Sequence, residues 1–286
     1  MLQKEALDQF IRAALAEDIG SGDHSTLASI PAGATGTARL KIKEEGVLAG
    51  MEVAEAVFRL LDPNTDFIPF KKDGESMQPG EIAFEVTAGV RTLLSAERLV
   101  LNCMQRMSGI ATLTRTYTDR LKGYHTRVLD TRKTTPNFRM LEKEAVRIGG
   151  GVNHRIGLYD MIMLKDNHID FSGGIIPAVE RVVAYLKENK LDLKIEVEAR
   201  NIEDVQEILK VGQVHRIMLD NFRPEQIAPA LALINGKYET EASGGITIEN
   251  VEAYAKTGVD YVSVGAIIHH AVSLDLSLKA VLHPSA

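Results

Sequence analysis

The sequence predicts an α/β protein whose second half forms an incomplete barrel of parallel strands surrounded by helices. From about residue 125, short apolar stretches typical of strands alternate with stretches that have the 3.6-residue period of helices. This alternation is typical of parallel strands joined by helical crossovers. Nearly every strand-like stretch has charged residues or glycines at its C-terminal end, where (β/α) barrels build their active sites. Fewer than eight strands are visible, so we expect an incomplete barrel.

The composition is that of an ordinary globular protein. The 286 residues carry a formal net charge of −6, with 45% hydrophobic and 25% charged residues. No apolar run approaches the roughly 20 residues of a membrane span, and the N-terminus lacks the apolar block of a signal peptide. The acidic balance argues against a nucleic-acid surface, and the single cysteine, Cys103, fits a reducing compartment. We therefore expect a cytoplasmic protein that binds neither nucleic acid nor membranes.

Residues 1–115 are expected to form a first domain of mixed α and β structure. Apolar residues at helical spacing predict its helices, and alternating residues bounded by glycines predict its strands. The expected elements are helices over 4–17 and 51–62, strands within 35–50 and 73–86, and a long helix over 92–121. Gly109 is the one position in the long helix where we expect an irregularity.

Residues 116–286 are expected to form the barrel domain. Its strand-like stretches read RVLDTRK, MIMLK, KIEVEAR, RIMLDN, YETEASGG and YVSVGA. Helices are expected over 137–150, over 201–212 with Asn201 as the N-cap, and over 247–258 beginning at Thr247. A last helix is expected to pack back on the first domain.

Polar residues gather at the ends of these strands. They are Arg132, Lys133, Lys165, Glu198, Asp220, Ser243, Gly244 and Gly265. Within IEVEA, Glu196 and Glu198 share one face of the strand. A carboxylate inside a barrel must be paired or bind a ligand, because an isolated buried charge is very costly. The sequence therefore predicts that the bases line a barrel mouth, which would bind a small anion.

Two glycine-containing loops suit a phosphate group. ASGGIT ends one strand and leads into the helix expected at Thr247, so its backbone N–H groups are available to an anion. VGAIIHH follows the next strand and adds Gly265 and His269. The alternative is that the glycines only make tight turns. Because a phosphate site in the last two loops recurs in barrels, we favour the phosphate.

The remaining charged residues allow more than one interpretation. Together, the bases could hold a substrate with several carboxylates or phosphates, although each one alone is more often a structural ion pair. They are Arg132, Lys133, His154, Arg155 and Lys165. Glu198 and Asp220 suit a hydrated Mg²⁺, but pairing with the barrel lysines fits their spacing equally well.

Several of these motifs resemble the quinolinate phosphoribosyltransferase family. They are DTRKTTP, GGGVNHRIGLYDMIMLKDNHI, IEVEA, IMLDNF and EASGGIT, with further matches in the first domain. The resemblance implies an N-terminal α/β-sandwich domain, an incomplete α/β barrel and at least a homodimer with shared active sites. The implied reaction joins quinolinate to 5-phosphoribosyl 1-pyrophosphate with Mg²⁺ and releases pyrophosphate and CO2. Nicotinate mononucleotide is the product, in de novo NAD biosynthesis.

The resemblance also implies a role for each candidate residue. Arg132, His154 and Arg155 would bind the quinolinate carboxylates, and Lys133 and Lys165 would act on both substrates as catalytic cations. Glu198 and Asp220 would be the catalytic acids near the ribose hydroxyls and the metal. Arg98 would reach into a neighbouring subunit's site. The 5-phosphate would lie against Ser243, Gly244, Gly265 and His269.

The chain departs from the family pattern in two loops. Asn137 and Phe138 stand where the family usually has glycine and leucine, and IIHH replaces a more common threonine-histidine-serine ending. Alternatives are a molybdenum-transport-associated relative, a nicotinate phosphoribosyltransferase and a catalytically idle anion-binding or scaffold protein. The intact KDNH segment and the complete set of cations favour quinolinate.

Overall fold

A computed structural model describes residues 2–281 and divides the chain into two compact units. The first unit contains the described parts of 1–115, 134–150 and 270–286, and the second contains 116–133 and 151–269. Residues 134–150 and 270–281 were expected in the barrel domain but group with the first unit. The reason is packing, since both segments bury apolar residues such as Leu141 and Leu278 within that unit.

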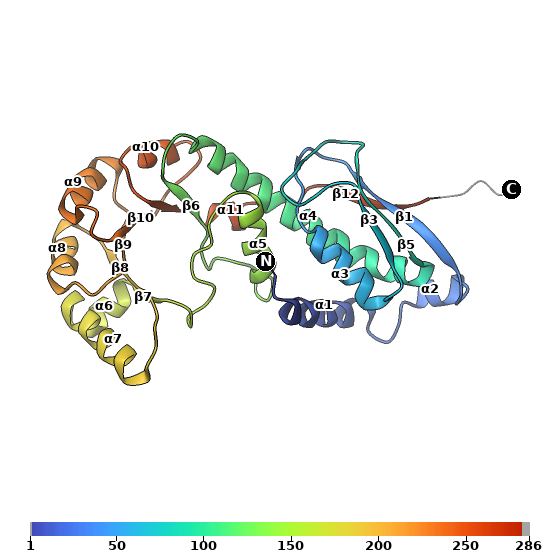
Figure 1. Ribbon diagram of the computed structural model, residues 1–286, viewed down its shortest axis with the longest axis horizontal. Coiled ribbons are helices and arrows are strands. Elements are labelled where there is room, and N and C mark those ends of the chain that lie inside the picture. The colour runs from blue at the N-terminus through green and yellow to red at the C-terminus, as the bar shows by residue number, and fades with distance from the viewer. Residues whose placement is uncertain (1, 282–286) are drawn as a thin grey trace. The chain divides into compact units, whose positions relative to one another are not determined.

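The first unit is built on a four-stranded antiparallel sheet with the order β12-β1-β5-β3. Figure 1 shows α3 and α4 beside one face of this sheet. Phe58, Phe67 and Phe84 form its aromatic core, with ring centroids 4.5–6.4 Å apart. The elements are α1 Lys4–Ile19, α2 His24–Ser29, β1 Thr35–Ile42, β2 Gly46–Val47, α3 Met51–Leu61, β3 Asp66–Pro69, β4 Ser76–Met77, β5 Ile82–Gly89, α4 Val90–Arg120, α5 Arg139–Ile148 and β12 Leu276–Ala280.

Two expectations for this unit are wrong. The last element is a strand, β12, in which Leu276 and Leu278 alternate inward, and it pairs antiparallel with β1. The chain therefore does return to the first unit, but as a strand and not as a helix. The second error concerns α4, which continues through Gly109 without a break. A Cβ at Gly109 would lie 2.0 Å from the Val272 carbonyl oxygen, so this glycine permits a close approach of two backbones.

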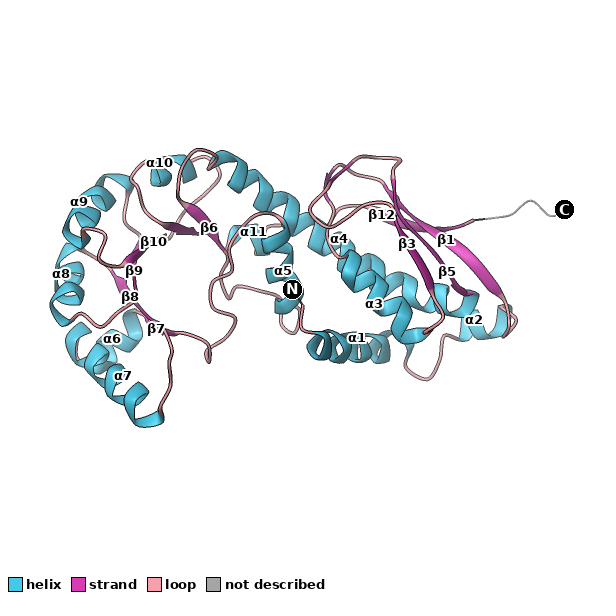
Figure 2. Cartoon of the chain, in the orientation of Figure 1, coloured by secondary structure: helices cyan, strands magenta, loops and turns pink. Residues whose placement is uncertain are grey.

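The second unit is a six-stranded parallel sheet with helices around its outside (Figure 2). Its strand order is β6-β11-β10-β9-β8-β7. This arrangement confirms the incomplete α/β barrel. The elements are β6 Arg127–Leu129, β7 Ile162–Leu164, α6 Asp166–Ser172, α7 Ile175–Asn189, β8 Ile195–Ala199, α8 Ile202–Val211, β9 Arg216–Asp220, α9 Pro224–Ile234, β10 Glu239–Ser243, α10 Val251–Ala255, β11 Tyr261–Ser263 and α11 Ala266–His269. Over the part of the chain that the structure describes, no helix has the length and apolar character of a membrane span.

Helix boundaries in this unit follow local capping. The Asn201 side chain accepts a hydrogen bond from the Asp204 N–H, which confirms the expected cap of α8. The helix expected to begin at Thr247 begins only at Val251. Asn250 holds the preceding segment as a turn, because its side chain accepts from the Thr247 N–H at 2.8 Å and donates to the Gly245 carbonyl at 3.0 Å. The ASGGIT loop therefore leads into a turn, and no helix N-terminus stands at Thr247.

Candidate active site

The C-terminal ends of the six parallel strands bring the predicted polar residues to one edge of the sheet. Asp220 ends β9 and pairs in register with Ser243, which ends β10. Glu198 lies one residue before the end of β8, and Lys165 follows β7 directly. Gly265 comes two residues after β11. We call this edge of the sheet, with the loops that follow the strands, the rim.

Two carboxylates and a lysine lie close together at the rim. Burial raises the pKa of Glu198, the charge of Asp220 raises it further, and Lys165 lowers it. Burial likewise raises the pKa of Asp220, against hydrogen bonds from Asn221 and Ser243 and the charge of Lys165. Two acids whose negative charges are incompletely balanced form a favourable site for a cation. Carboxylate oxygens are also the ligands that Mg²⁺ prefers, so these two residues fit the expected metal chemically.

Asn221 ties the acidic part of the rim to the ASGGIT loop, and the sequence prediction missed it. Its backbone N–H donates to the Ser243 carbonyl at 2.7 Å, and its side-chain amide donates to Asp220 Oδ2 at 2.6 Å. A Cβ at Gly244 would lie 2.2 Å from Asn221 Oδ1. Gly244 also has a φ of 95°. Only glycine satisfies both constraints here, and the close approach brings Asp220, Ser243 and Gly244 into one site.

The last loop of the barrel joins the rim beside β6. A Cβ added at Gly265 would lie 3.1 Å from His269 Nε2 and 3.2 Å from Lys133 Cδ. Lys133 follows β6, which pairs with β11. The structure thus brings Gly265 and His269 together, as the sequence predicted for a phosphate site, and places Lys133 beside them.

Two arginines lie near each other in the segments that follow β6 and precede β7. Burial lowers the pKa of Arg155, and the charge of Arg132 lowers it further. The Arg155 guanidinium donates to the Met161 carbonyl at 3.3 Å. Since like charges repel, two neighbouring guanidinium groups favour an anion between them. A dicarboxylate is a suitable ligand for such a pair.

The departures at Asn137 and Phe138, which lie in one of the two loops, have physical explanations within the first unit. Asn137 has a φ of 61°, the left-handed region that asparagine tolerates better than most residues other than glycine. Phe138 packs edge-on against Phe10 with ring centroids 5.6 Å apart. Neither change removes a charged group.

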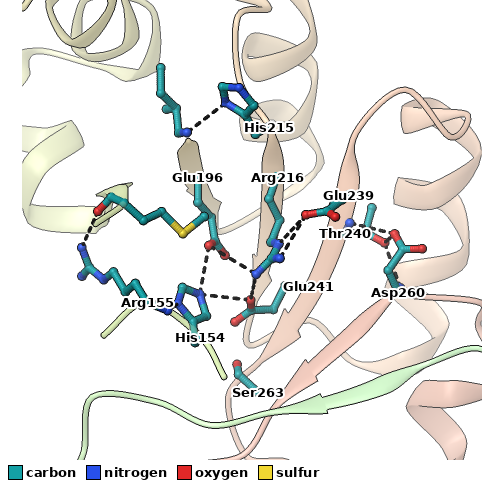
Figure 3. Close-up of polar contacts among 12 residues, drawn as sticks. His154, Arg155, Glu196, His215, Arg216, Glu239, Thr240, Glu241, Asp260 and Ser263 are labelled. Carbon is teal, nitrogen blue, oxygen red and sulfur yellow. Dashed lines mark hydrogen bonds and ion pairs between the residues drawn. The ribbon is translucent and has the colours of Figure 1, made fainter. Parts of the chain in front are cut away.

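Below the rim lies a set of buried charges that we call the interior cluster: His154, Glu196, Arg216 and Glu241. His154 Nε2 lies 3.0 Å from Glu196 Oε2 and 3.3 Å from Glu241 Oε2. Arg216 Nη1 lies 3.2 Å from Glu241 Oε2 and 3.8 Å from Glu196 Oε2. Figure 3 shows the His154 ring directed between the two carboxylates, with the Arg216 guanidinium beside them.

The shifted pKa values of the cluster follow from burial and mutual charge. Burial opposes the charged form of His154, but hydrogen bonds and charges of Glu196 and Glu241 outweigh it and raise the pKa to about 9. Burial and the charge of Glu241 raise the pKa of Glu196 to about 7. For Glu241, burial is outweighed by the hydrogen bond from His154, so its pKa lies below the usual value. The cluster holds two acids against two bases.

Further contacts fix His154 and Arg216. The His154 backbone N–H donates to Asp130 Oδ1 at 2.8 Å, and His154 Nδ1 accepts from the Arg155 N–H at 2.6 Å. Arg216 also pairs with Glu239 at 3.0 Å, and its guanidinium carbon lies 4.4 Å from the Tyr261 ring centroid. Both ring nitrogens of His154 therefore contact protein groups.

The sequence prediction missed Arg216, Glu241 and Tyr261, although a signal was present. Alternation in RIMLD puts Arg216 on the same face as Asp220, and alternation in YETEAS puts Glu241 on the same face as Ser243. Charged side chains that point into the barrel below the rim must be neutralised by neighbouring charges. The alternation therefore indicated a buried cluster of opposite charges. The parallel register places Arg216 between Glu196 and Glu239.

Arg98 belongs to a different compact unit from the rim residues. It is an exposed residue of α4 in the first unit, whereas the rim belongs to the second. Its expected reach into a neighbouring subunit stays a prediction.

One group of metal-ligand type emerges among the residues that the structure describes. His154, Glu196 and Glu241 offer one atom each within 4.8 Å of one another. Arg216 already pairs with the carboxylates of this group. The cation chemistry of the rim rests instead on Glu198 and Asp220.

Family models match nearly the whole chain. The quinolinate phosphoribosyl transferase N-terminal domain matches residues 23–108, and the C-terminal domain of the same family matches residues 110–279.

Individual relatives agree with these matches. Quinolinate phosphoribosyltransferase [decarboxylating] 2b, mitochondrial, from Nicotiana tabacum is 42% identical over 96% of this chain and 82% of its own length. Nicotinate-nucleotide pyrophosphorylase [carboxylating], chloroplastic, from Arabidopsis thaliana is 42% identical with the same coverage. The crystal structure of NadC from Streptococcus pyogenes has a TM-score of 0.91 and 40% identity, covering 98% of this chain and 99% of that one.

Proposed function

The chain belongs to the quinolinate phosphoribosyltransferase family, and on that premise we propose how its rim performs the reaction. The enzyme transfers the phosphoribosyl group of 5-phosphoribosyl 1-pyrophosphate to quinolinate with decarboxylation. The products are nicotinate mononucleotide, pyrophosphate and CO2, and the reaction belongs to de novo NAD biosynthesis.

The observation that carries the proposed site is the proximity of Arg132 and Arg155, whose charge lowers the pKa of Arg155. Quinolinate carries two adjacent carboxylates, and two neighbouring guanidinium groups bind such a dianion with charge-assisted hydrogen bonds. Lys133, which follows Arg132 in the chain, and Lys165, which follows β7, would add positive charge around both substrates. A substrate with one carboxylate would leave part of this charge without a counterion.

The other parts of the rim suit the second substrate. Ser243, Gly244, Gly265 and His269 would hold the 5-phosphate, with Lys133 beside them. Glu198 and Asp220 would lie near the ribose hydroxyls and would hold Mg²⁺, which supplies neutralisation of the pyrophosphate charge when it is bound. The raised pKa values of these two acids support a role for a cation at this point.

Positioning and charge account for the chemistry. Loss of pyrophosphate leaves a ribose with oxocarbenium character, which the carboxylates stabilise, and the pyridine nitrogen of quinolinate then bonds to the same carbon. The positively charged ring accepts the electron pair of the bond to the 2-carboxylate, CO2 leaves, and a proton takes its place. Shielding from water favours this step because the carboxylate loses its hydration.

A radiochemical assay tests the proposal. Quinolinate labelled at the 2-carboxylate is incubated with the protein, with and without 5-phosphoribosyl 1-pyrophosphate and Mg²⁺. Labelled CO2 is expected only when all components are present. Absence of release under every condition would contradict the proposal and favour an idle anion-binding protein. Turnover of nicotinate in place of quinolinate would favour the nicotinate enzyme.

A homodimer with shared sites is part of the proposal. Arg98, exposed on α4, would complete the site of a neighbouring subunit, as the family resemblance implies. Mixing inactive Arg98→Ala protein with inactive Lys133→Ala protein is expected to restore some activity, because one site of a mixed dimer would be intact. Failure to restore activity despite demonstrated subunit exchange would contradict shared sites.

We also propose a cytoplasmic location. The single cysteine, Cys103, is buried, and burial raises the pKa of its thiol to about 12, which suits an unreactive side chain in a reducing compartment. Fractionation of source cells with an antibody to the protein tests this, since the tobacco and Arabidopsis relatives are named mitochondrial and chloroplastic.

A further inference from the structure

The contacts of His154 point inward and along the backbone. Its side chain is only 5% exposed, and Nε2 lies between the carboxylates of Glu196 and Glu241. Nδ1 accepts the N–H of Arg155 at 2.6 Å, and the His154 N–H donates to the buried carboxylate of Asp130. Neither ring nitrogen is left to donate a hydrogen bond to a substrate in this geometry.

The same contacts connect the interior cluster to Arg155. The ring joins two buried carboxylates at one edge and the peptide N–H between residues 154 and 155 at the other. Figure 3 shows the Arg155 side chain leaving this peptide in a different direction from the His154 ring. Loss of the carboxylates would free the ring to turn, and the peptide that carries Arg155 would lose one of its restraints.

We propose that His154 is a positioning residue, held by Glu196 and Glu241, which acts on quinolinate by fixing Arg155. This inference rests on the proposed function and deepens it, because Arg155 is one of the two arginines assigned to the carboxylates. It replaces the expected direct contact of His154 with substrate.

A metal ion held by His154, Glu196 and Glu241 is the competing interpretation, since their ligand-type atoms lie within 4.8 Å of one another. Two observations favour positioning. Arg216 Nη1 lies 3.2 Å from Glu241 Oε2 and 3.8 Å from Glu196 Oε2, so a cation already faces these oxygens. The distances from Nε2 to the two carboxylate oxygens, 3.0 and 3.3 Å, are also those of direct ion pairs between the ring and the two acids.

Kinetics of two methionine variants test the proposal. Glu241→Met removes a carboxylate that contacts both His154 and Arg216. Glu239→Met is the matched control, because Glu239 pairs with Arg216 through Nη2 and its side chain is 39% exposed, away from His154. We expect Glu241→Met to raise the quinolinate KM at least about tenfold, as for a displaced binding group, with the KM for 5-phosphoribosyl 1-pyrophosphate within about twofold. Glu239→Met is expected to change neither.

Two outcomes of this experiment overturn the proposal. An unchanged quinolinate KM in Glu241→Met would mean that the cluster does not act on Arg155. An equal rise of both KM values would mean that the cluster supports the whole barrel and not one arginine. Because the wild-type assay with labelled quinolinate is run alongside, failure of this inference is distinguishable from failure of the proposed function.

A double variant separates positioning from direct contact. If His154 acts through the cluster, Glu241→Met combined with His154→Gln should raise the quinolinate KM no further than the more severe single variant. A quinolinate KM in the double variant that rises by the product of the two single-variant factors would mean that His154 contacts quinolinate independently of Glu241. The proposal would then be wrong.

Measurements on the unaltered protein keep the test decisive if Glu241→Met does not fold. In protein labelled with nitrogen-15 at histidine, the His154 ring is expected to keep its protonation pattern when quinolinate is added alone. A proton gained or lost at either ring nitrogen would overturn the proposal. So would one equivalent of zinc or manganese retained through dialysis and lost in His154→Gln, since that result would identify a metal site.

Discussion

The rim and the interior cluster share the inner face of one sheet and balance their charges differently. In the interior cluster, Glu196 and Glu241 face His154 and Arg216 at 3.0–3.8 Å. At the rim, burial and the charge of Asp220 raise the pKa of Glu198, and burial and the charge of Arg132 lower the pKa of Arg155. Glu196 and Glu198 stand only two residues apart on β8.

The difference indicates what each layer is for. Buried charges that face opposite charges are neutralised by the protein itself and hold the barrel in one arrangement. Like charges kept side by side are stabilised when a ligand of opposite charge arrives, so the rim is built to be completed by substrates and a cation. The sheet thus supplies a self-contained layer that supports an incomplete one.

The largest expected effect comes from breaking the interior cluster. Arg216→Met should lower the free energy of unfolding by about 3–5 kcal/mol, because two buried carboxylates lose their guanidinium partner. Arg155→Met should lower the free energy of unfolding by less than about 1 kcal/mol. The change removes the hydrogen bond to the Met161 carbonyl but also relieves the repulsion from Arg132, and the two effects offset each other. Urea unfolding followed by circular dichroism measures both. Equal losses in the two variants would show that the layers do not differ in this respect.

Quinolinate binding should depend on the rim arginines. Arg132→Ala should weaken quinolinate binding by about 2–5 kcal/mol, as for a truncated partner of a desolvated charge. Arg127→Ala is the control, because Arg127 is exposed at the opposite end of β6. Isothermal titration with quinolinate measures both affinities. An unchanged affinity in Arg132→Ala would mean that the carboxylates bind elsewhere.

Much of the rim was predictable from sequence because its position follows from chain order alone. Lys165, Glu198, Asp220, Ser243 and Gly265 stand at the ends of parallel strands, and parallel strands end at the same edge. The Asn201 cap was predictable for a similar reason, since it needs only a local pattern.

The interior cluster was not predicted because alternation gives the face of a residue and not its partner. Glu241 and His154 are 87 positions apart by number, and only the folded barrel brings them to 3.3 Å. The late start of α10 depends on one side chain, Asn250, competing with helix formation. The strand β12 gains its order from pairing with β1, which no local pattern records.

A moderate effect is expected from pH, and it belongs to the interior cluster. His154 has a folded-state pKa of about 9, above its ordinary value, so the folded protein holds a proton that the unfolded chain releases. Its stabilising contribution is therefore complete below about pH 6.5 and is lost as pH rises through about 9, by at most about 3 kcal/mol. His154 Nδ1 accepts the Arg155 N–H, and a proton on Nδ1 would displace this hydrogen bond. The loss of unfolding free energy is therefore smaller than this upper limit.

Urea unfolding of wild type and His154→Gln between pH 6 and about 9.5 measures this dependence. The wild type should lose stability across the range, and His154→Gln should lose less. An identical slope in both proteins would assign the dependence to other groups.

The smallest expected effect is a gain in stability. Asp220→Asn removes one of two neighbouring negative charges, so it should raise the free energy of unfolding by about 0.5–1 kcal/mol while turnover with Mg²⁺ falls. Asp204→Asn is the contrasting variant, because Asp204 accepts the Arg200 N–H at 2.8 Å and pairs with that guanidinium at 3.3 Å. It should lose stability and keep turnover. If Asp220→Asn were destabilised as much as Asp204→Asn, the rim acids would be as well paired as ordinary surface acids, and the contrast with the interior cluster would disappear.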